Sequence, residues 1–157
     1  ADQTNVLMAE AAYRGWIGGS AENYYNVGVQ AAMRQFSQFP NGRKLYNEYL
    51  TEDAINQYLS DNPFDATNAL KQINTQYWIT CFCDEYETFS NWRRSGYPEL
   101  VYPNLYLNPV PGVNHNLSRR FTYPDTESQI NTANYEAAVS NLSKGNSFES
   151  RVWWDIA

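Results

Sequence analysis

The chain of 157 residues is poor in cysteine and histidine, and it lacks a long apolar run. Two cysteines and one histidine exclude a zinc site built from Cys and His at ligand spacing. No stretch approaches the roughly 18 consecutive apolar residues of a membrane-spanning helix, and residues 1–14 lack the pattern of a signal peptide. We therefore expect no metal, no cofactor and no spanning segment. Cys81 and Cys83 are expected to be small buried side chains without a disulfide.

Positive charge is scarce as well. The formal net charge is −6 and the sequence pI is about 4.7, which argues against a nucleic-acid partner, since such proteins usually carry a basic surface. Aliphatic side chains are few, with 6 Ile, 10 Leu and 8 Val. The chain is instead rich in 13 Tyr, 7 Phe, 5 Trp and 18 Asn, an aromatic content that excludes disorder. A surface of amides and phenols suits an extracytoplasmic protein that meets neutral polar ligands.

Apolar spacing predicts a mainly α-helical fold with tetratricopeptide-like hairpins. Small residues at 28, 31 and 32 would allow two helices to approach closely. Ser20, Thr51, Asp65 and Asn131 are the expected N-caps. Gly96 is expected to end a helix before Tyr97-Pro98. The predicted helices are 4–14, 21–38, 43–50, 52–60, 66–83, 84–94 and 132–142.

Proline divides the chain into three parts. The helical part is 1–95, the loop-rich part is 96–130, and the final helix and tail occupy 131–157. Five of the seven prolines fall between 96 and 128, which excludes a long helix there and favours an ordered loop with a short strand near 119–123. Length alone predicts one domain. The two adjacent tryptophans of the tail favour its docking back onto the helices.

Two clusters carry side chains of the kinds that cleave or bind sugars. Asp84, Glu85 and Glu87 would serve a glycoside hydrolase only if two carboxylates flanked a sugar bond, whereas neighbours on one helix more often form a solvated or salt-bridged face. Tyr102 and Tyr106 with Asn104 offer the ring faces and amides that a neutral sugar uses. They are the candidate glycan-binding residues, with packing of the loop onto the helices as the alternative.

Several short motifs resemble, in order and spacing, the C-terminal part of the SusD/RagB family of outer-membrane lipoproteins. The most specific are Trp-Arg-Arg-Ser-Gly-Tyr-Pro at 92–98 and Arg-Arg-Phe-Thr-Tyr-Pro at 119–124, and Trp-Trp-Asp at 153–155 supports them. The resemblance extends over nearly the whole chain. It implies a structural rather than ligand-binding role for these motif residues: Trp92, Arg93, Arg94, Arg119, Arg120, Trp153 and Trp154.

The resemblance implies a non-catalytic protein of the Bacteroidetes outer-membrane surface that binds glycans or other nutrients and works with a SusC-like TonB-dependent transporter. It also implies that the chain is a C-terminal fragment, that the lipid-bearing cysteine lies outside it, and that much of the ligand surface lies upstream. Two alternatives remain. One is a tetratricopeptide-like module that binds proteins; the other is a glycoside-active domain that uses Asp84, Glu85 and Glu87.

Overall fold

The computed structural model describes residues 2–100 and 117–155, and its described secondary structure is helical throughout. The candidate residues Tyr102, Asn104 and Tyr106 lie outside the described residues. The chain forms two compact units, Ala1–Pro98 and Glu99–Ala157, where length alone predicted one domain. The boundary falls close to the start of the proline-rich part.

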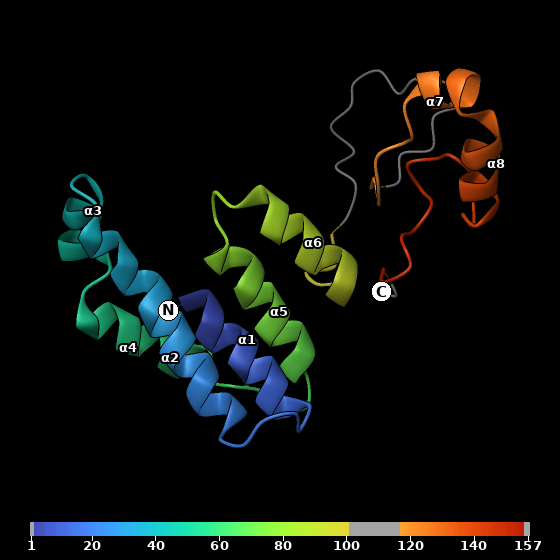
Figure 1. The fold of residues 1–157 in the computed structure, drawn as a ribbon. Coiled ribbons are helices and arrows are strands. Elements are labelled where there is room, and N and C mark those ends of the chain that lie inside the picture. The colour runs from blue at the N-terminus through green and yellow to red at the C-terminus, as the bar shows by residue number, and fades with distance from the viewer. Residues whose placement is uncertain (1, 101–116, 156–157) are drawn as a thin grey trace. The chain divides into compact units, whose positions relative to one another are not determined.

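Unit 1 is an array of helical hairpins. Its elements are α1 (Asp2–Tyr13), α2 (Ala21–Arg34), the 3-10 turn η1 (Gln35–Gln38), α3 (Gly42–Tyr49), α4 (Glu52–Asp61), α5 (Ala69–Thr80) and α6 (Glu85–Ser95). Figure 1 shows α1 between α2 and α5, with α6 on the other side of α5. The expected mainly helical fold with hairpins is confirmed.

The caps and the close helix contact explain where the helices begin and how the first pair packs. The side chains of Ser20 and Thr51 accept from the backbone N–H groups three residues on, as predicted. Gly96 ends α6 at a positive φ of 77°. A Cβ at Gly28 would lie 2.6 Å from Val6 Cγ2, so only glycine allows this approach of α1 to α2.

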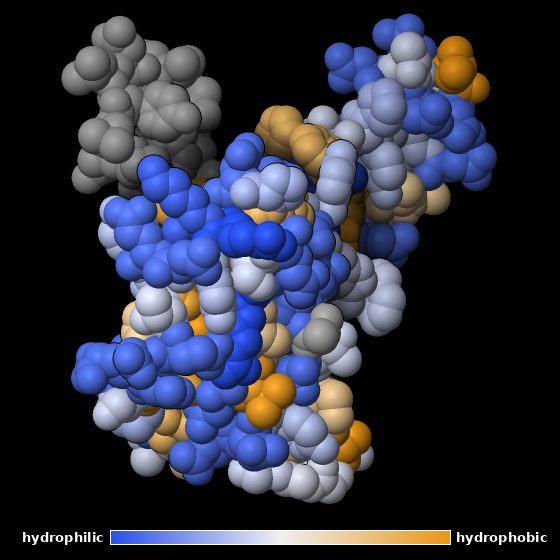
Figure 2. All heavy atoms as spheres, turned by 90° about the vertical axis from the view of Figure 1, so that its left-hand side faces the viewer, coloured by the Kyte–Doolittle hydropathy of each residue, from blue (hydrophilic) through white to orange (hydrophobic). Residues whose placement is uncertain are grey.

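The core of unit 1 is small and mixes aliphatic with aromatic side chains. Its buried members come from α1, α2, α5 and the residue after α5: Val6, Ala9, Tyr25, Val29, Ala69, Ile73, Tyr77 and Cys81. Phe64 packs against it, with its ring centroid 5.5 Å from that of Tyr25. Figure 2 shows the face of unit 1 over α3 and α4 as mainly hydrophilic. This agrees with the low content of aliphatic residues in the chain.

The predicted helix 66–83 is too long at both ends. Asp65 Oδ1 accepts from the N–H and hydroxyl of Thr67, which holds a local turn and delays the helix to Ala69. At the other end α5 stops at Thr80. Cys81 is buried as expected, but Cys83 is exposed and has a φ of 69°, so the prediction of two buried cysteines is wrong for Cys83.

Unit 2 contains α7 (Asp125–Ile130) and α8 (Thr132–Ser140). The sequence missed α7 because its region is proline-rich, yet Pro124 stands just before the first turn, where no backbone N–H is needed. Asn131 stands at the N-cap position of α8, as predicted, but its side chain makes no capping bond to the backbone. It donates to Glu127 and accepts from the side chain of Asn134 instead.

The predicted strand near 119–123 is absent from the described part of unit 2. One backbone bond, from Arg119 N to Phe148 O at 2.8 Å, joins this segment to the tail. The amide of Asn146 takes the place of a neighbouring strand, since it accepts from Tyr123 N at 2.8 Å and donates to Tyr123 O at 3.4 Å. A side chain therefore satisfies backbone groups that a ladder would otherwise pair.

The close contact at Gly28 predicts that Gly28→Ala destabilises unit 1. Overpacking costs about 1–3 kcal/mol and exceeds the gain of about 1 kcal/mol in helix propensity. We therefore expect a net loss of up to about 2 kcal/mol in the free energy of unfolding, measured with denaturant. Gly18→Ala is the matched control, because its added Cβ would meet nothing within 4 Å. Equal stability of the two variants would contradict the packing argument.

Candidate functional site

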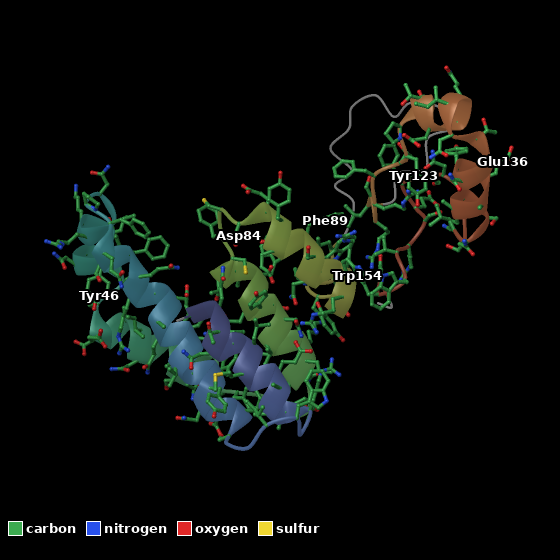
Figure 3. All side chains as sticks on the ribbon, viewed as in Figure 1. Tyr46, Asp84, Phe89, Tyr123, Glu136 and Trp154 are labelled. Atoms are coloured by element: carbon green, nitrogen blue, oxygen red, sulfur yellow. The ribbon has the colours of Figure 1, made fainter. Side chains whose placement is uncertain are left out.

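The Trp-Arg-Arg motif occupies the last turns of α6. Asp84 begins the helix by accepting from Glu87 N at 3.3 Å, and acidic first and basic last turns complement the helix dipole. Figure 3 labels Asp84 at this start and Phe89 further along the helix. The ring of Phe89 stacks on Trp92 at 6.2 Å and lies 4.2 Å from the guanidinium of Arg93. These contacts leave Arg94 to face α1 and α5.

Arg94 forms a two-pronged ion pair with Glu10 of α1. Its Nη1 and Nη2 donate to the two carboxylate oxygens at 2.8 and 2.7 Å, and Arg14 Nε donates to the same carboxylate at 2.8 Å. Arg94 also donates to Asn91 Oδ1 and Asn74 Oδ1, and Asn91 donates to Asn74. We call these five side chains the Glu10–Arg94 network, which joins α1, α5 and α6.

The network sets the charge of Glu10, which is only 3% exposed. Burial raises the pKa of its carboxyl, but the hydrogen bonds and charges of Arg94 and Arg14 outweigh burial, and the net pKa lies below the ordinary value. A carboxyl with a lowered folded-state pKa stabilises the fold above its unfolded pKa. That contribution is lost as the pH falls through the folded-state pKa.

Two of the three carboxylates of the acidic cluster make structural contacts at the start of α6. Asp84 caps α6, and Glu87 Oε1 accepts from the hydroxyl of Tyr77 at 2.8 Å. These contacts hold two of the three carboxylates to helix α6 and its neighbour α5. These structural contacts agree with the alternative interpretation, in which neighbouring carboxylates form a hydrogen-bonded helix face.

The Arg-Arg motif of unit 2 also forms an ion pair with a buried carboxylate, as Arg94 does with Glu10. Arg119 pairs with Asp155 through both carboxylate oxygens, with Nε donating to Oδ2 at 2.8 Å, and the Asp155 side chain is fully buried. Arg120 lies over the ring of Tyr123 at 4.6 Å and donates to Asn146 Oδ1. Both arginines thus contact groups of their own unit.

The tail is tied to unit 2 by Asp155, whereas its docking onto the helices of unit 1 stays a prediction. Trp153 is 91% exposed, and Trp154, labelled in Figure 3, is partly buried. Ser150 closes the turn before the tail, because its hydroxyl accepts from Lys144 N and donates to Gly145 O. The indole of Trp153 does not take part in this closure.

A hollow of about 500 Å³ opens on unit 1 between α4, α5 and the buried Tyr25 of α2; we call it the α4–α5 hollow. Phenols, amides and one hydroxyl line most of it, with a carboxylate, an ammonium and a single aliphatic side chain. The lining residues are Tyr25, Tyr58, Asn62, Asp65, Asn68, Lys71, Gln72, Thr75, Gln76 and Ile79.

A smaller hollow of about 220 Å³ lies in unit 2, beside α7 and α8. The rings of Tyr123 and Tyr135 meet edge to face at 6.2 Å, and Asn146 Nδ2 donates to the Tyr135 hydroxyl. The other lining residues are Glu127, Asn131, Asn134 and Ala138.

The sequence missed the residues of both hollows. A pattern was nevertheless present in α5 and its N-cap residue, because polar side chains recur there at helical spacing beside the apolar stripe: Asn68, Gln72, Thr75 and Gln76. No single-sequence signal distinguishes such a polar stripe from an ordinary solvated helix face. In residues 2–100 and 117–155, no three His, Cys, Asp or Glu side chains gather as a metal site would need. None of the described helices has the length and hydropathy needed to cross a bilayer.

These features define a helical protein of hairpin arrays whose arginine motifs make internal ion pairs. The family model described as SusD-like, Susd and RagB outer membrane lipoprotein, matches residues 1–155. The chain therefore belongs to the SusD-like family. No curated protein matches the chain.

Solved structures resemble the chain over nearly all of its length. A chitin-binding protein is 34% identical with a TM-score of 0.80, and the match covers 99% of this chain and 33% of that one. A SusD-like protein of Bacteroidetes AC2a is 29% identical with a TM-score of 0.84, and the match covers 99% of this chain and 30% of that one. A chitin-binding SusD homologue from Flavobacterium johnsoniae is 25% identical with a TM-score of 0.68, and the match covers 99% of this chain and 36% of that one. The chain spans about one third of the length of these relatives.

The Glu10–Arg94 network predicts that Arg94→Met destabilises unit 1 by about 2–3 kcal/mol. Removing one partner of a buried ion pair costs about 3–5 kcal/mol, and we expect less because Arg94 is partly exposed and Arg14 remains. The measurement is the free energy of unfolding in denaturant at neutral pH.

The control for Arg94→Met is Arg34→Met, which breaks the exposed pair with Glu52 and should cost at most about 1 kcal/mol. Acid titration adds a second readout. Glu10→Gln should flatten the loss of stability below pH 4.5, since the wild-type carboxylate loses its contribution there. A loss from Arg94→Met no larger than that from Arg34→Met would contradict a structural role for the network.

The pair Arg119–Asp155 predicts that Asp155→Asn loosens unit 2. The change leaves Arg119 without its buried counter-charge, which we expect to cost about 3 kcal/mol. Hydrogen exchange of the backbone amides of Arg119 and Asp155 measures the local opening. Glu149→Gln breaks the more exposed pair with Lys144 and serves as the control. It should change the free energy of local opening, derived from the exchange rates, by less than about 1 kcal/mol. Unchanged exchange in Asp155→Asn would show that the tail is held by other contacts.

Proposed function

We propose that the full-length protein captures neutral oligosaccharides at the outer-membrane surface and delivers them to a SusC-like TonB-dependent transporter without chemical conversion. The observation that carries this proposal is the family match over residues 1–155, together with the 34% identity to a chitin-binding protein. The description of the family as outer membrane lipoproteins supports the location. The transporter partnership rests on the resemblance to the SusD/RagB family.

The described surface supports a neutral ligand. Amides and phenols line both hollows and can exchange hydrogen bonds with sugar hydroxyls, while ring faces pack against the C–H faces of a sugar. The candidate loop residues Tyr102, Asn104 and Tyr106 stay a prediction of the same kind. The motif residues Trp92, Arg93, Arg94, Arg119, Arg120, Trp153 and Trp154 are proposed to maintain the fold rather than to touch ligand.

The absence of catalysis in this proposal is supported by the engagement of the acidic cluster. Asp84 and Glu87 already serve as a helix cap and as a hydrogen-bond acceptor for Tyr77. An inverting or retaining glycosidase would need a free pair of carboxyl groups on either side of the bond to be cut.

We expect the purified full-length protein to bind soluble chitin oligosaccharides, measured by isothermal titration calorimetry, and to return them unshortened. Cello-oligosaccharides and malto-oligosaccharides serve as matched neutral probes that define the sugar specificity. A triple variant of Asp84, Glu85 and Glu87 to the corresponding amides should bind as the wild type does.

Two results would overturn this function. Release of shorter sugars by the wild type, lost in the triple amide variant, would show a glycoside-active enzyme. Blank results with all three oligosaccharide families, combined with tight binding of peptides, would favour the tetratricopeptide-like interaction module.

A further inference from the structure

We propose that the α4–α5 hollow of unit 1 is itself a binding subsite for a short stretch of neutral oligosaccharide, an inference that rests on the proposed function. Its volume of about 500 Å³ falls within the roughly 300–1,000 Å³ typical of small-molecule pockets. The hollow of unit 2, at about 220 Å³, is smaller than that range. Size therefore favours the hollow of unit 1.

The lining of the α4–α5 hollow selects for a neutral, hydroxyl-rich ligand. Its two charged residues, Asp65 and Lys71, have opposite signs, so the lining carries no net charge. Ile79 is the one aliphatic side chain of the lining, which gives little hold for the apolar anchor residues of a bound peptide. Four amides, two phenols and one threonine hydroxyl instead supply both donors and acceptors.

Gln76 offers a ligand an amide nitrogen that no described protein group accepts from. It is 6% exposed and lines the hollow, and its Oε1 accepts from the Tyr58 hydroxyl at 3.3 Å. Its Nε2 donates to no group among the residues that the structure describes. This atom still reaches the solvent of the hollow, since it is not one of the buried side-chain atoms that lack a hydrogen-bond partner. A hydroxyl of a bound sugar would replace water as the acceptor of its N–H groups.

Thr75, one residue earlier on α5, adds a second unpaired group. Its hydroxyl has no hydrogen-bond partner within the described part of the chain, although helical threonines often bond the carbonyl four residues back. Thr75 and Gln76 thus offer a hydroxyl and an amide from adjacent positions on one helix. A sugar with neighbouring hydroxyls is suited to bridge two such groups.

The opposite wall of the hollow is held in place before any ligand arrives. Gln72 accepts from Asp65 N at 2.7 Å and donates to Pro63 O at 2.9 Å, which clamps the loop after α4 onto α5. Asp65 in turn accepts from Thr67 and Asn68. Asn62 donates to Tyr58 O, and its Oδ1 accepts from no described group. A fixed wall with a spare acceptor lowers the ordering cost of binding.

To test the subsite, a large side chain is introduced into the hollow of the full-length protein. Wild type and variants are then titrated with the hexamer of N-acetylglucosamine, and with cello- and malto-oligosaccharides of matched length as further probes. Thr75→Trp should weaken binding of the preferred probe by at least about tenfold, because the indole occupies the space of the sugar. The control Asn56→Trp adds the same side chain to an exposed position of α4 outside the hollow and should change affinity less than about twofold.

Thr75→Val keeps the shape and removes only the hydroxyl, so the proposal stays testable even if the tryptophan variant unfolds. We expect Thr75→Val to weaken binding about threefold, the value of one ordinary hydrogen bond, with thermal unfolding unchanged. Wild-type affinity in both a folded Thr75→Trp and Thr75→Val would overturn the subsite and leave the proposed function standing. A wild type that binds none of the probes would overturn the proposed function itself.

Discussion

The ion pair between Glu10 and Arg94 is the interaction on which unit 1 depends. It joins the first and last helices of the unit across 84 residues of sequence and meets α5 through Asn74. A chain with few Ile and Leu residues cannot rely on a large aliphatic core, and the apolar cluster beside the network is small. The directional geometry of a two-pronged carboxylate–guanidinium pair specifies how these helices meet, which non-directional apolar contacts do less well.

Unit 2 is also held together by an ion pair between an arginine and a buried carboxylate. Arg119 and the buried Asp155 bring the segment before α7 to the end of the chain, and Asn146 replaces a missing strand by bonding both backbone groups of Tyr123. In both units the arginine motifs make internal contacts. The abundance of asparagine follows partly from this architecture, since Asn74, Asn91 and Asn146 all act as internal connectors.

The sequence predicted those parts of the fold that depend on local chemistry. The caps at Ser20 and Thr51 and the stop at Gly96 act within one or two turns of helix, and the structure bears them out. Gly28 was also predicted, because its small size is visible in the sequence although its contact is with α1. The expected strand failed because a distant side chain, Asn146, takes the place of a strand partner for Tyr123. The late start of α5 has a local cause, the turn that Asp65 makes with Thr67. The candidate site was missed because its polar stripe on α5 looks like any solvated face until α4 and Tyr25 lie opposite.

The contrast between the network and the hollow also explains which polar groups remain for a ligand. In the Glu10–Arg94 network each carboxylate oxygen and both inner amides have protein partners, so the network is committed to the fold. On the adjoining face of α5, Gln72 is similarly engaged, whereas Thr75 and the amide nitrogen of Gln76 are not. One helix thus carries satisfied polar groups toward α1 and α6 and unsatisfied ones toward α4. Both groups line the hollow and have no partner within the described part of the chain, so they stay available to exchange water for the hydroxyls of a ligand.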